Sequence, residues 1–167
     1  LRRARLGAEV LTRTPVTSAR RDGDVWQAQM TNPDGSTRDL RARAIVNTAG
    51  PWVEQVLGNV AGVNSAKRIR LVKGSHIVMK RWWRGDHGYV LQAPDKRLSF
   101  VNPYMDELAL IGTTEIPFDG APEDVAIEDH EITYLLGILH SYFNTDHGPD
   151  DLVRSYSGLR PLFADAA

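Results

Sequence analysis

The sequence of 167 residues contains no cysteine. This absence excludes disulfide bonds, cysteine metal sites and thiol catalysis, and it fits a reducing compartment. The 20 Lys and Arg residues against 21 Asp and Glu residues leave a net charge of -1, which predicts no bulk attraction to nucleic acid or to an anionic membrane. No apolar run approaches the roughly 18 residues that cross a bilayer, so we expect no transmembrane segment.

Several ligand-binding motifs are also missing. The sequence has no G-x-x-x-x-G-K-[ST] loop and no G-x-G-x-x-G after a strand, so it lacks a dinucleotide fingerprint of its own. His130, His140 and His147 lack the spacing of metal ligands, and we predict no metal site. The chain begins without Met and ends in "LRPLFADAA", and we expect a segment of a longer protein.

The first third of the sequence predicts three antiparallel strands in a meander. Strand-like runs cover residues 8–21, 25–30 and 36–46, separated by the turn-forming stretches "DGD" and "NPDG". Pro15 predicts an edge strand or a bulge for the first run. The apolar trio at 44–46 predicts that the third strand enters a buried layer.

The stretch "AIVNTAGPW" at 44–52 predicts a strand, a small turn and a helix that begins at Pro51. Such a turn exposes backbone N–H groups at the start of the helix, which suits a phosphate or the edge of a flavin. The alternative is a structural turn that simply needs Gly50.

The remainder of the sequence predicts more antiparallel strands and one clear helix. Strand-like runs cover 88–93, 97–104, 107–115 and 150–162, and apolar residues recur at helical spacing over 128–143. The fold class is therefore α+β, mostly antiparallel sheet with few helices.

The strand-like run "RIRLVKGSHIVMK" at 68–80 carries polar residues at its centre. We expect Gly74 to permit a bulge, which would bring Lys73 and His76 to one face of the strand. Lys73 could then hold an anionic substrate, and His76 could accept or orient a proton near neutral pH. The alternative is an edge strand with solvated polar groups.

Arg160 lies between Leu159 and Pro161 in an otherwise apolar strand end. A guanidinium there needs a partner, and its fork matches a phosphate or a carboxylate. A structural salt bridge is the alternative.

Five stretches together resemble one family, the FAD-dependent aerobic glycerol-3-phosphate dehydrogenases. They are, in order, "RLGAEVLTRT", "ARAIVNTAGPWV", "IRLVKGSHIV", "DKRLSFVNPYMDELALIGTTE" and "VRSYSGLRPL", and they span essentially the whole chain. The resemblance implies the flavoprotein fold of D-amino-acid oxidase. It assigns residues 1–66 to part of an FAD-binding domain of Rossmann type and 67–167 to a substrate (cap) domain.

The resemblance also implies roles for single residues. It places the backbone of Val16 at the adenine and the turn Thr48–Gly50, with Ala49 at its centre, near the ribose and phosphates of FAD. It places His76 over the flavin beside the substrate and Arg160 at the phosphate group, while Lys73 is a further substrate-binding candidate.

The implied reaction is oxidation of sn-glycerol 3-phosphate to dihydroxyacetone phosphate, with electrons passed through FAD to quinone. The resemblance further implies a peripheral protein at the cytoplasmic face of the cell membrane. Because the fingerprint for the FAD pyrophosphate is missing, we expect little or no activity from the chain alone. Two alternatives remain open: a non-catalytic anion-binding or interaction domain, and an amine-oxidising relative such as a glycine or sarcosine oxidase.

Overall fold

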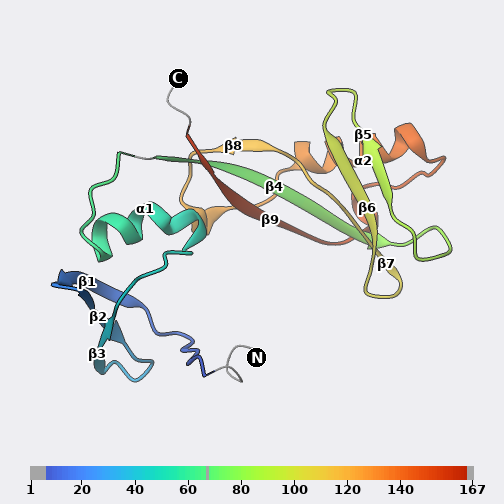
Figure 1. The fold of residues 1–167 in the computed structure, drawn as a ribbon. Helices are drawn as coiled ribbons and strands as arrows, with labels where there is room; N and C mark the ends of the chain where they lie inside the picture. Colours follow the sequence, from blue (N-terminus) through green and yellow to red (C-terminus); the bar gives the residue numbers. More distant parts are fainter. Residues whose placement is uncertain (1–6, 67, 165–167) are drawn as a thin grey trace. The chain divides into compact units, whose positions relative to one another are not determined.

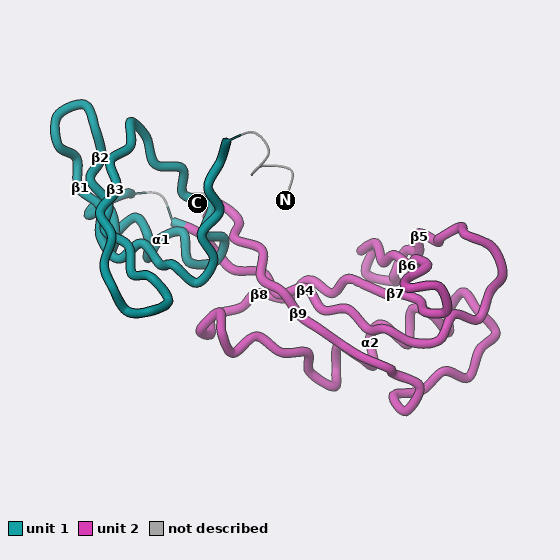
Figure 2. The backbone as a smooth tube through the Cα atoms, turned by 90° about the horizontal axis from the view of Figure 1, so that it is seen from below, with its two compact units in different colours: residues 1–68 teal, residues 69–167 magenta. Residues whose placement is uncertain are grey.

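The computed structural model describes residues 7–66 and 68–164 of a chain that divides into two compact units, Leu1–Arg68 and Ile69–Ala167 (Figure 2). The boundary lies two residues beyond the expected one, and the roles assigned to the two parts remain predictions. The predicted α+β class, with mostly antiparallel sheet and few helices, is confirmed. Among the described helices, none has the length and apolar character to cross a membrane.

The first unit contains the predicted meander. Its strands are β1 (Val16–Asp22), β2 (Val25–Thr31) and β3 (Thr37–Ala42), which pair in sequence order and antiparallel (Figure 1). Gly23 adopts a φ of 58° in the two-residue turn between β1 and β2, a conformation that glycine reaches without strain. β1 is an edge strand with a register shift between Val16 and Ser18, as Pro15 predicted.

The expectation that the third strand continues into a buried layer is wrong. β3 ends at Ala42, and Val46 exposes 82% of its surface and Ile45 40%. Within the described part of the first unit, no strand pairs with the apolar trio 44–46. Apolar composition alone therefore did not determine burial here, because a strand also needs a neighbour to pair with.

A short helical segment follows the meander, as predicted. It consists of the 3₁₀ turn η2 (Gly50–Trp52), the α-helical turn α1 (Val53–Gln55) and the π-helical turn η3 (Val56–Val60). Pro51 lies in its first turn, where the missing N–H removes no helical hydrogen bond. Gly62 follows the segment with a φ of 62°, the left-handed conformation in which glycine commonly ends a helix.

The second unit is built on a six-stranded sheet around one long central strand (Figure 1). Its strands are β4 (Ile69–Lys80), β5 (Tyr89–Gln92), β6 (Leu98–Tyr104), β7 (Leu108–Gly112), β8 (Ile116–Phe118) and β9 (Leu152–Phe163). β9 pairs with β4 along one edge. On the other edge, β7 pairs with the second half of β4 and β8 with the first half.

One face of this sheet packs against α2 (Asp129–Tyr142), which confirms the predicted helix. Short 3₁₀ turns, η4 (Pro122–Asp124) and η5 (Pro149–Asp151), lie in the loops before and after it. The helix buries its apolar stripe against the sheet, with Leu135 and Leu139 fully buried beside Ile77 and Ile111. This layer is the hydrophobic core of the unit.

Candidate functional site

The sheet of the second unit has a second face, opposite α2, which we call the open face. One row of directly paired residues crosses five of its strands: Val90, Phe100, Gly112, His76 and Tyr156. Because side chains alternate along a strand, these residues point away from the core residues beside them. Val90, Phe100 and Tyr156 expose 62%, 44% and 44% of their surfaces, so the row presents apolar and aromatic groups to solvent.

His76 lies at the centre of this row. Its ring stacks on Tyr156 with a centroid distance of 5.0 Å and an interplanar angle of 10°. On the other side the ring lies directly over Gly112, where a Cβ atom would approach His76 Cγ to 2.7 Å. Only glycine leaves room for the imidazole at that position.

The imidazole of His76 is held in its neutral form. Burial lowers its pKa below the ordinary value, and the nearby charge of Arg160 lowers the pKa further. The Nδ1 atom is buried and has no hydrogen-bond partner among the described residues. A neutral imidazole can exchange a proton with a bound molecule through a ring nitrogen that the molecule reaches.

Arg160 lies on the same face of the sheet, four residues beyond Tyr156 along β9. It is paired with Val72, and its Nη2 atom donates to the carbonyl oxygen of Thr114 at 3.3 Å. The guanidinium crosses over Gly74, where a Cβ atom would lie 3.1 Å from Nη2. Since Gly74 and His76 are two residues apart on β4, this crossing point lies about 7 Å from the histidine backbone.

The edge of the sheet is interrupted next to this crossing point. β7 leaves β4 after Gly112, and β8 joins it at Ile116, so residues 113–115 form no ladder pairs. Thr114 replaces the missing ladder: its Oγ1 accepts from Ser75 N at 2.9 Å, and its N donates to Ser75 O at 3.3 Å. Thr113 Oγ1 approaches the position where Gly74 would carry a Cβ, at 2.6 Å.

The predicted bulge at Gly74 is wrong. The pairing of β4 with β9 is regular from Ile69 to Val78, and its register shift falls between Val78 and Met79. Lys73 and His76 therefore point to opposite faces of the sheet, as an uninterrupted strand requires. Gly74 serves a different purpose, because the open space above it admits the side chains of Arg160 and Thr113.

Lys73 consequently lies on the covered face, away from the other candidates. Its ammonium donates to Ala126 O at 3.1 Å and pairs with Glu128 at 2.6 Å and with Glu131 at 2.8 Å. These three acceptors match the three protons of an ammonium group. Instead of the expected substrate contact, Lys73 thus makes a structural contact between the sheet and the start of α2.

A network of buried polar groups surrounds this contact. The carboxylate of Glu131 accepts from Ser75 Oγ at 2.7 Å, from Thr114 Oγ1 at 2.7 Å and from the N-cap N–H of Glu128 at 3.0 Å. Ser75 Oγ also shares a 2.7 Å hydrogen bond with Ser157 Oγ on β9. We call these residues the buried network: Lys73, Ser75, Thr114, Glu131 and Ser157.

The electrostatics of the buried network favour charged groups. Burial raises the pKa of Glu131, but the hydrogen bonds from Lys73, Thr114 and Ser75 outweigh burial and hold the pKa below its ordinary value. Burial likewise lowers the pKa of Lys73, but its two carboxylate partners raise it above the ordinary value. The pair is therefore ionised at neutral pH.

The cofactor candidates predicted from the sequence lie in the first unit. Val16 begins β1 beside the register shift, pairs with Met30 and exposes 43% of its surface. Ala49 N donates to Asn47 Oδ1 at 3.1 Å, and Gly50 has a φ of 56° at the first position of η2. The predicted turn at Thr48–Gly50 is thus present, and its cofactor role remains a prediction.

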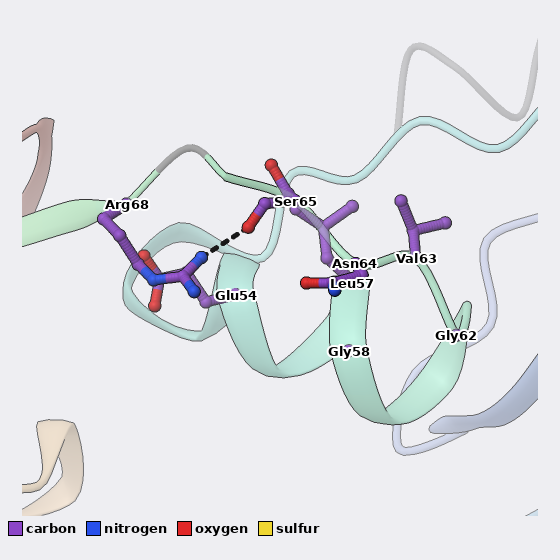
Figure 3. Close-up of a pocket in the computed structure, with 8 residues that line it drawn as sticks. All are labelled: Glu54, Leu57, Gly58, Gly62, Val63, Asn64, Ser65 and Arg68. Carbon is purple, nitrogen blue, oxygen red and sulfur yellow. Dashed lines mark hydrogen bonds between the residues drawn. The ribbon is translucent and has the colours of Figure 1, made fainter.

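The first unit also contains a cleft beside η3 that sequence reasoning missed (Figure 3). Its lining residues are Glu54, Leu57, Gly58, Gly62, Val63, Asn64, Ser65 and Arg68. Figure 3 shows the guanidinium of Arg68 directed at Ser65, whose carbonyl oxygen accepts its hydrogen bond. Because the lining contains one carboxylate and one guanidinium, it favours neither an anionic nor a cationic ligand.

The structure brings His76 and Arg160 together and separates Lys73 from them. Sequence reasoning missed Gly112, Thr114 and Tyr156, which complete the surroundings of the two candidates. The stretch "IGTTE" gave one usable signal, since a glycine and two hydroxyl residues end an otherwise apolar strand. Among the described residues, no cluster of His, Asp or Glu could hold a metal ion.

Comparisons with known proteins show what the whole chain is similar to. A model of the family described as FAD dependent oxidoreductase matches residues 1–167. D-erythritol 1-phosphate dehydrogenase of Brucella abortus is 50% identical over 163 residues, 97% of this chain and 32% of that protein. Aerobic glycerol-3-phosphate dehydrogenase of Escherichia coli is 45% identical over 162 residues, 96% of this chain and 32% of that protein.

A solved structure has the same fold. The glycerol-3-phosphate dehydrogenase of Bacillus halodurans, solved as a complex with FAD, superposes with a TM-score of 0.82 at 25% identity. The match covers 96% of this chain and 33% of that protein. The chain thus spans about a third of the length of the relatives it matches.

Proposed function

The chain belongs to the family of FAD-dependent oxidoreductases, and from this premise we propose that it forms the substrate-binding part of a polyol-phosphate dehydrogenase. The first candidate substrate is sn-glycerol 3-phosphate, which would be oxidised at C2 to dihydroxyacetone phosphate. The reaction removes a hydride from C2 and a proton from its hydroxyl group. Two relatives that act on polyol phosphates by name support this substrate class.

The open face fits the cofactor of the family. It offers a row of apolar and aromatic side chains, together with a half-buried imidazole. Such a surface can lie against a planar ring system and still offer one polar contact. When bound, FAD supplies the two-electron acceptor that no side chain of this chain can provide.

The observation that carries the proposal is the placement of Arg160 relative to His76. The guanidinium crosses the open face at Gly74, about 7 Å along the strand from His76, and Arg160 is exposed. Its fork can bind a phosphate in two hydrogen bonds. The separation suits a three-carbon phosphate ester, with the phosphate at Arg160 and the hydroxyl group near the imidazole.

His76 is the proposed proton acceptor. Its lowered pKa keeps the ring neutral, because burial and then the charge of Arg160 disfavour the imidazolium. A neutral imidazole within reach of the substrate hydroxyl can accept its proton as the C–H bond breaks. In the first unit, we propose that Val16 and Thr48–Gly50, with Ala49, contact the adenine, ribose and phosphates of FAD.

D-erythritol 1-phosphate is the second candidate substrate. It is favoured by the 50% identity to the Brucella abortus enzyme, against 45% to the Escherichia coli enzyme. Both substrates offer a phosphate to Arg160 and a hydroxyl group to His76. An amine-oxidising role, with a carboxylate at Arg160, has no such support among the named relatives.

Three further features of the proposal come from the resemblance of the sequence. They are a quinone as the electron acceptor, a peripheral position at the cytoplasmic face of the cell membrane, and the lack of activity of the 167-residue chain by itself. The chain covers about a third of its relatives' length, and for that reason we expect turnover only in a longer protein.

A hybrid enzyme tests the proposed function. This chain would replace the matching segment of the Escherichia coli enzyme, and oxidation of glycerol 3-phosphate, erythritol 1-phosphate and glycine would be followed with a quinone analogue. We expect Arg160→Ala to raise KM for the phosphate ester about 10- to 100-fold, the size of a charged hydrogen-bond loss.

Arg154→Ala is the matched control, because Arg154 lies on the same strand and is paired with Val78. It should leave KM unchanged. A hybrid that binds FAD but oxidises neither phosphate ester would rule out the proposed substrate class. Preference for one ester over the other would decide between the two candidates.

A further inference from the structure

The buried network on the covered face reaches through the sheet to Arg160 on the open face. Thr114 is the connecting residue: its hydroxyl donates to Glu131 at 2.7 Å, while its carbonyl oxygen accepts from Arg160 Nη2 at 3.3 Å. Thr114 and Glu131 expose only 2% and 1% of their surfaces. Thr114 is therefore held by a hydrogen bond on the covered face, while its carbonyl oxygen accepts a hydrogen bond from the guanidinium on the open face.

A second connection runs through the neighbouring strand. Glu131 accepts from Ser75 Oγ at 2.7 Å, and Ser75 Oγ bonds Ser157 Oγ at 2.7 Å. Ser157 precedes Arg160 on β9 by three residues, and the two strands keep a regular register through this stretch. The carboxylate thus fixes both the strand that carries Arg160 and the loop that accepts its hydrogen bond.

We propose that Glu131, acting through Thr114 and Ser75, is a positioning residue that orients Arg160 for an anionic ligand on the open face. Residues 113–115 lack ladder pairing, so the network supplies the order that the sheet does not. A guanidinium held in one orientation loses less conformational entropy on binding than a mobile one. That the anion is a phosphate ester rests on the function proposed above.

The position of the carboxylate distinguishes this role from core packing alone. Glu131 is on the helix side of the sheet and touches no group of the open face directly. Two separate hydroxyl groups, however, lead from it to the surroundings of one arginine. Purely structural support would require only the pairing with Lys73.

The test uses the 167-residue chain and four substitutions. Thr114→Val removes the hydroxyl at nearly constant volume, and Thr114→Ser retains it. Ser157→Ala removes the hydroxyl that continues the second connection, at a half-buried site. If Thr114→Val fails to fold, Ser157→Ala alone tests whether the network orders Arg160. Thr133→Val is the control. The exposed hydroxyl of Thr133 on α2 donates to Asp129 O at 3.0 Å and takes no part in the buried network.

The first measurement is ¹⁵N relaxation of the Arg160 Nε–H group, assigned by its loss in Arg160→Lys. We expect an ordered guanidinium in the unmodified chain, in Thr114→Ser and in Thr133→Val, and a more mobile one in Thr114→Val and Ser157→Ala. A mobile Arg160 in the unmodified chain, or unchanged order in the folded Thr114→Val and Ser157→Ala chains, would overturn the proposal.

The second measurement is a titration with glycerol 3-phosphate and with erythritol 1-phosphate. We expect Thr114→Val to weaken binding about tenfold, the effect of ordering one long side chain, and Thr114→Ser to restore it. If Arg160 loses order as expected while neither ester binds even the unmodified chain, the positioning role stands and the substrate proposal loses its support. Equal binding in all folded variants would overturn the link between order and affinity.

Discussion

The two faces of the sheet in the second unit differ in whether the polar side chains of β4 have hydrogen-bond partners. On the covered face, β4 presents Lys73, Ser75 and Ile77, which are buried against α2, and both polar side chains have partners. On the open face it presents Gly74 and His76, whose Nδ1 atom has no hydrogen-bond partner in the described part of the chain. Successive side chains of β4 thus alternate between a buried face whose polar groups are hydrogen-bonded and an open face that leaves a polar atom unpaired within the described residues.

The difference indicates where stability and binding are located. Buried polar groups are tolerated only when they are hydrogen-bonded, and the covered face meets this condition through Glu131. The open face departs from it at a half-buried imidazole and at exposed aromatic side chains. Departures of this kind are expected where a protein meets a ligand. Substitutions on the two faces should therefore differ in what they damage.

The largest expected effect is the loss of the buried carboxylate. Glu131→Ala removes a partner from Lys73 and leaves two buried hydroxyl groups without their acceptor. We expect the free energy of unfolding to fall by about 3–5 kcal/mol, as for other broken buried ion pairs. Urea unfolding followed by circular dichroism would measure it.

Glu128→Ala is the matched comparison, since Glu128 binds the same lysine but its side chain is 63% exposed. Its loss should cost about 1 kcal/mol or less. Equal losses from the two substitutions would show that the burial of Glu131 and its hydrogen bonds to two hydroxyl groups add nothing to its pairing with Lys73.

A smaller effect is expected on the open face from Gly112→Ala. The added methyl group would approach His76 Cγ to 2.7 Å, so the imidazole must leave its stacked position. We expect a loss of about 1–3 kcal/mol from this overpacking, together with a changed chemical shift for the His76 ring.

Gly137→Ala in α2 is the control, because among the described residues no atom outside the glycine's own stretch of helix lies within 4 Å of the added group. A helical glycine replaced by alanine should gain about 0.5–1 kcal/mol. If Gly112→Ala is as harmless as Gly137→Ala, the close packing of the ring on β7 is not a constraint.

The elements of this comparison differ in how far the sequence predicts them. The period of 3.6 residues over 128–143 predicts α2, and turn residues predict the meander, because both signals are local. The contact between Lys73 and Glu131 joins residues 58 positions apart in the chain, and no local pattern reports it.

The glycine in "KGSH" shows a second limit. The sequence predicted a bulge at Gly74, but a glycine within a strand also occurs where other groups approach closely. Only the packed structure reveals that the side chains of Arg160 and Thr113 cross there. Polar residues within apolar strands pointed to His76 and Arg160, and the resemblance to a family added their expected roles, whereas their arrangement about Gly74 required the pairing of β4 with β9.

The smallest expected effect is a pH dependence that belongs to the open face alone. Because burial and Arg160 lower the pKa of His76 in the folded chain, the unfolded chain binds more protons once the pH falls below about 6.5. The unfolding free energy should therefore decrease as the pH falls from 7.5 through 6.5, and level off below the folded pKa. Each unit of pKa difference corresponds to about 1.4 kcal/mol.

His76→Phe isolates this contribution, since it retains an aromatic ring against Tyr156 but cannot titrate. The other four histidines are present in both chains, so the difference between the two unfolding free energies isolates His76. We expect the variant to gain stability relative to the unmodified chain as the pH falls from 7.5 to 5.5. A difference that is constant with pH would mean that the ring titrates as in water, and the open face would then lack the neutral imidazole on which the proposed proton transfer depends.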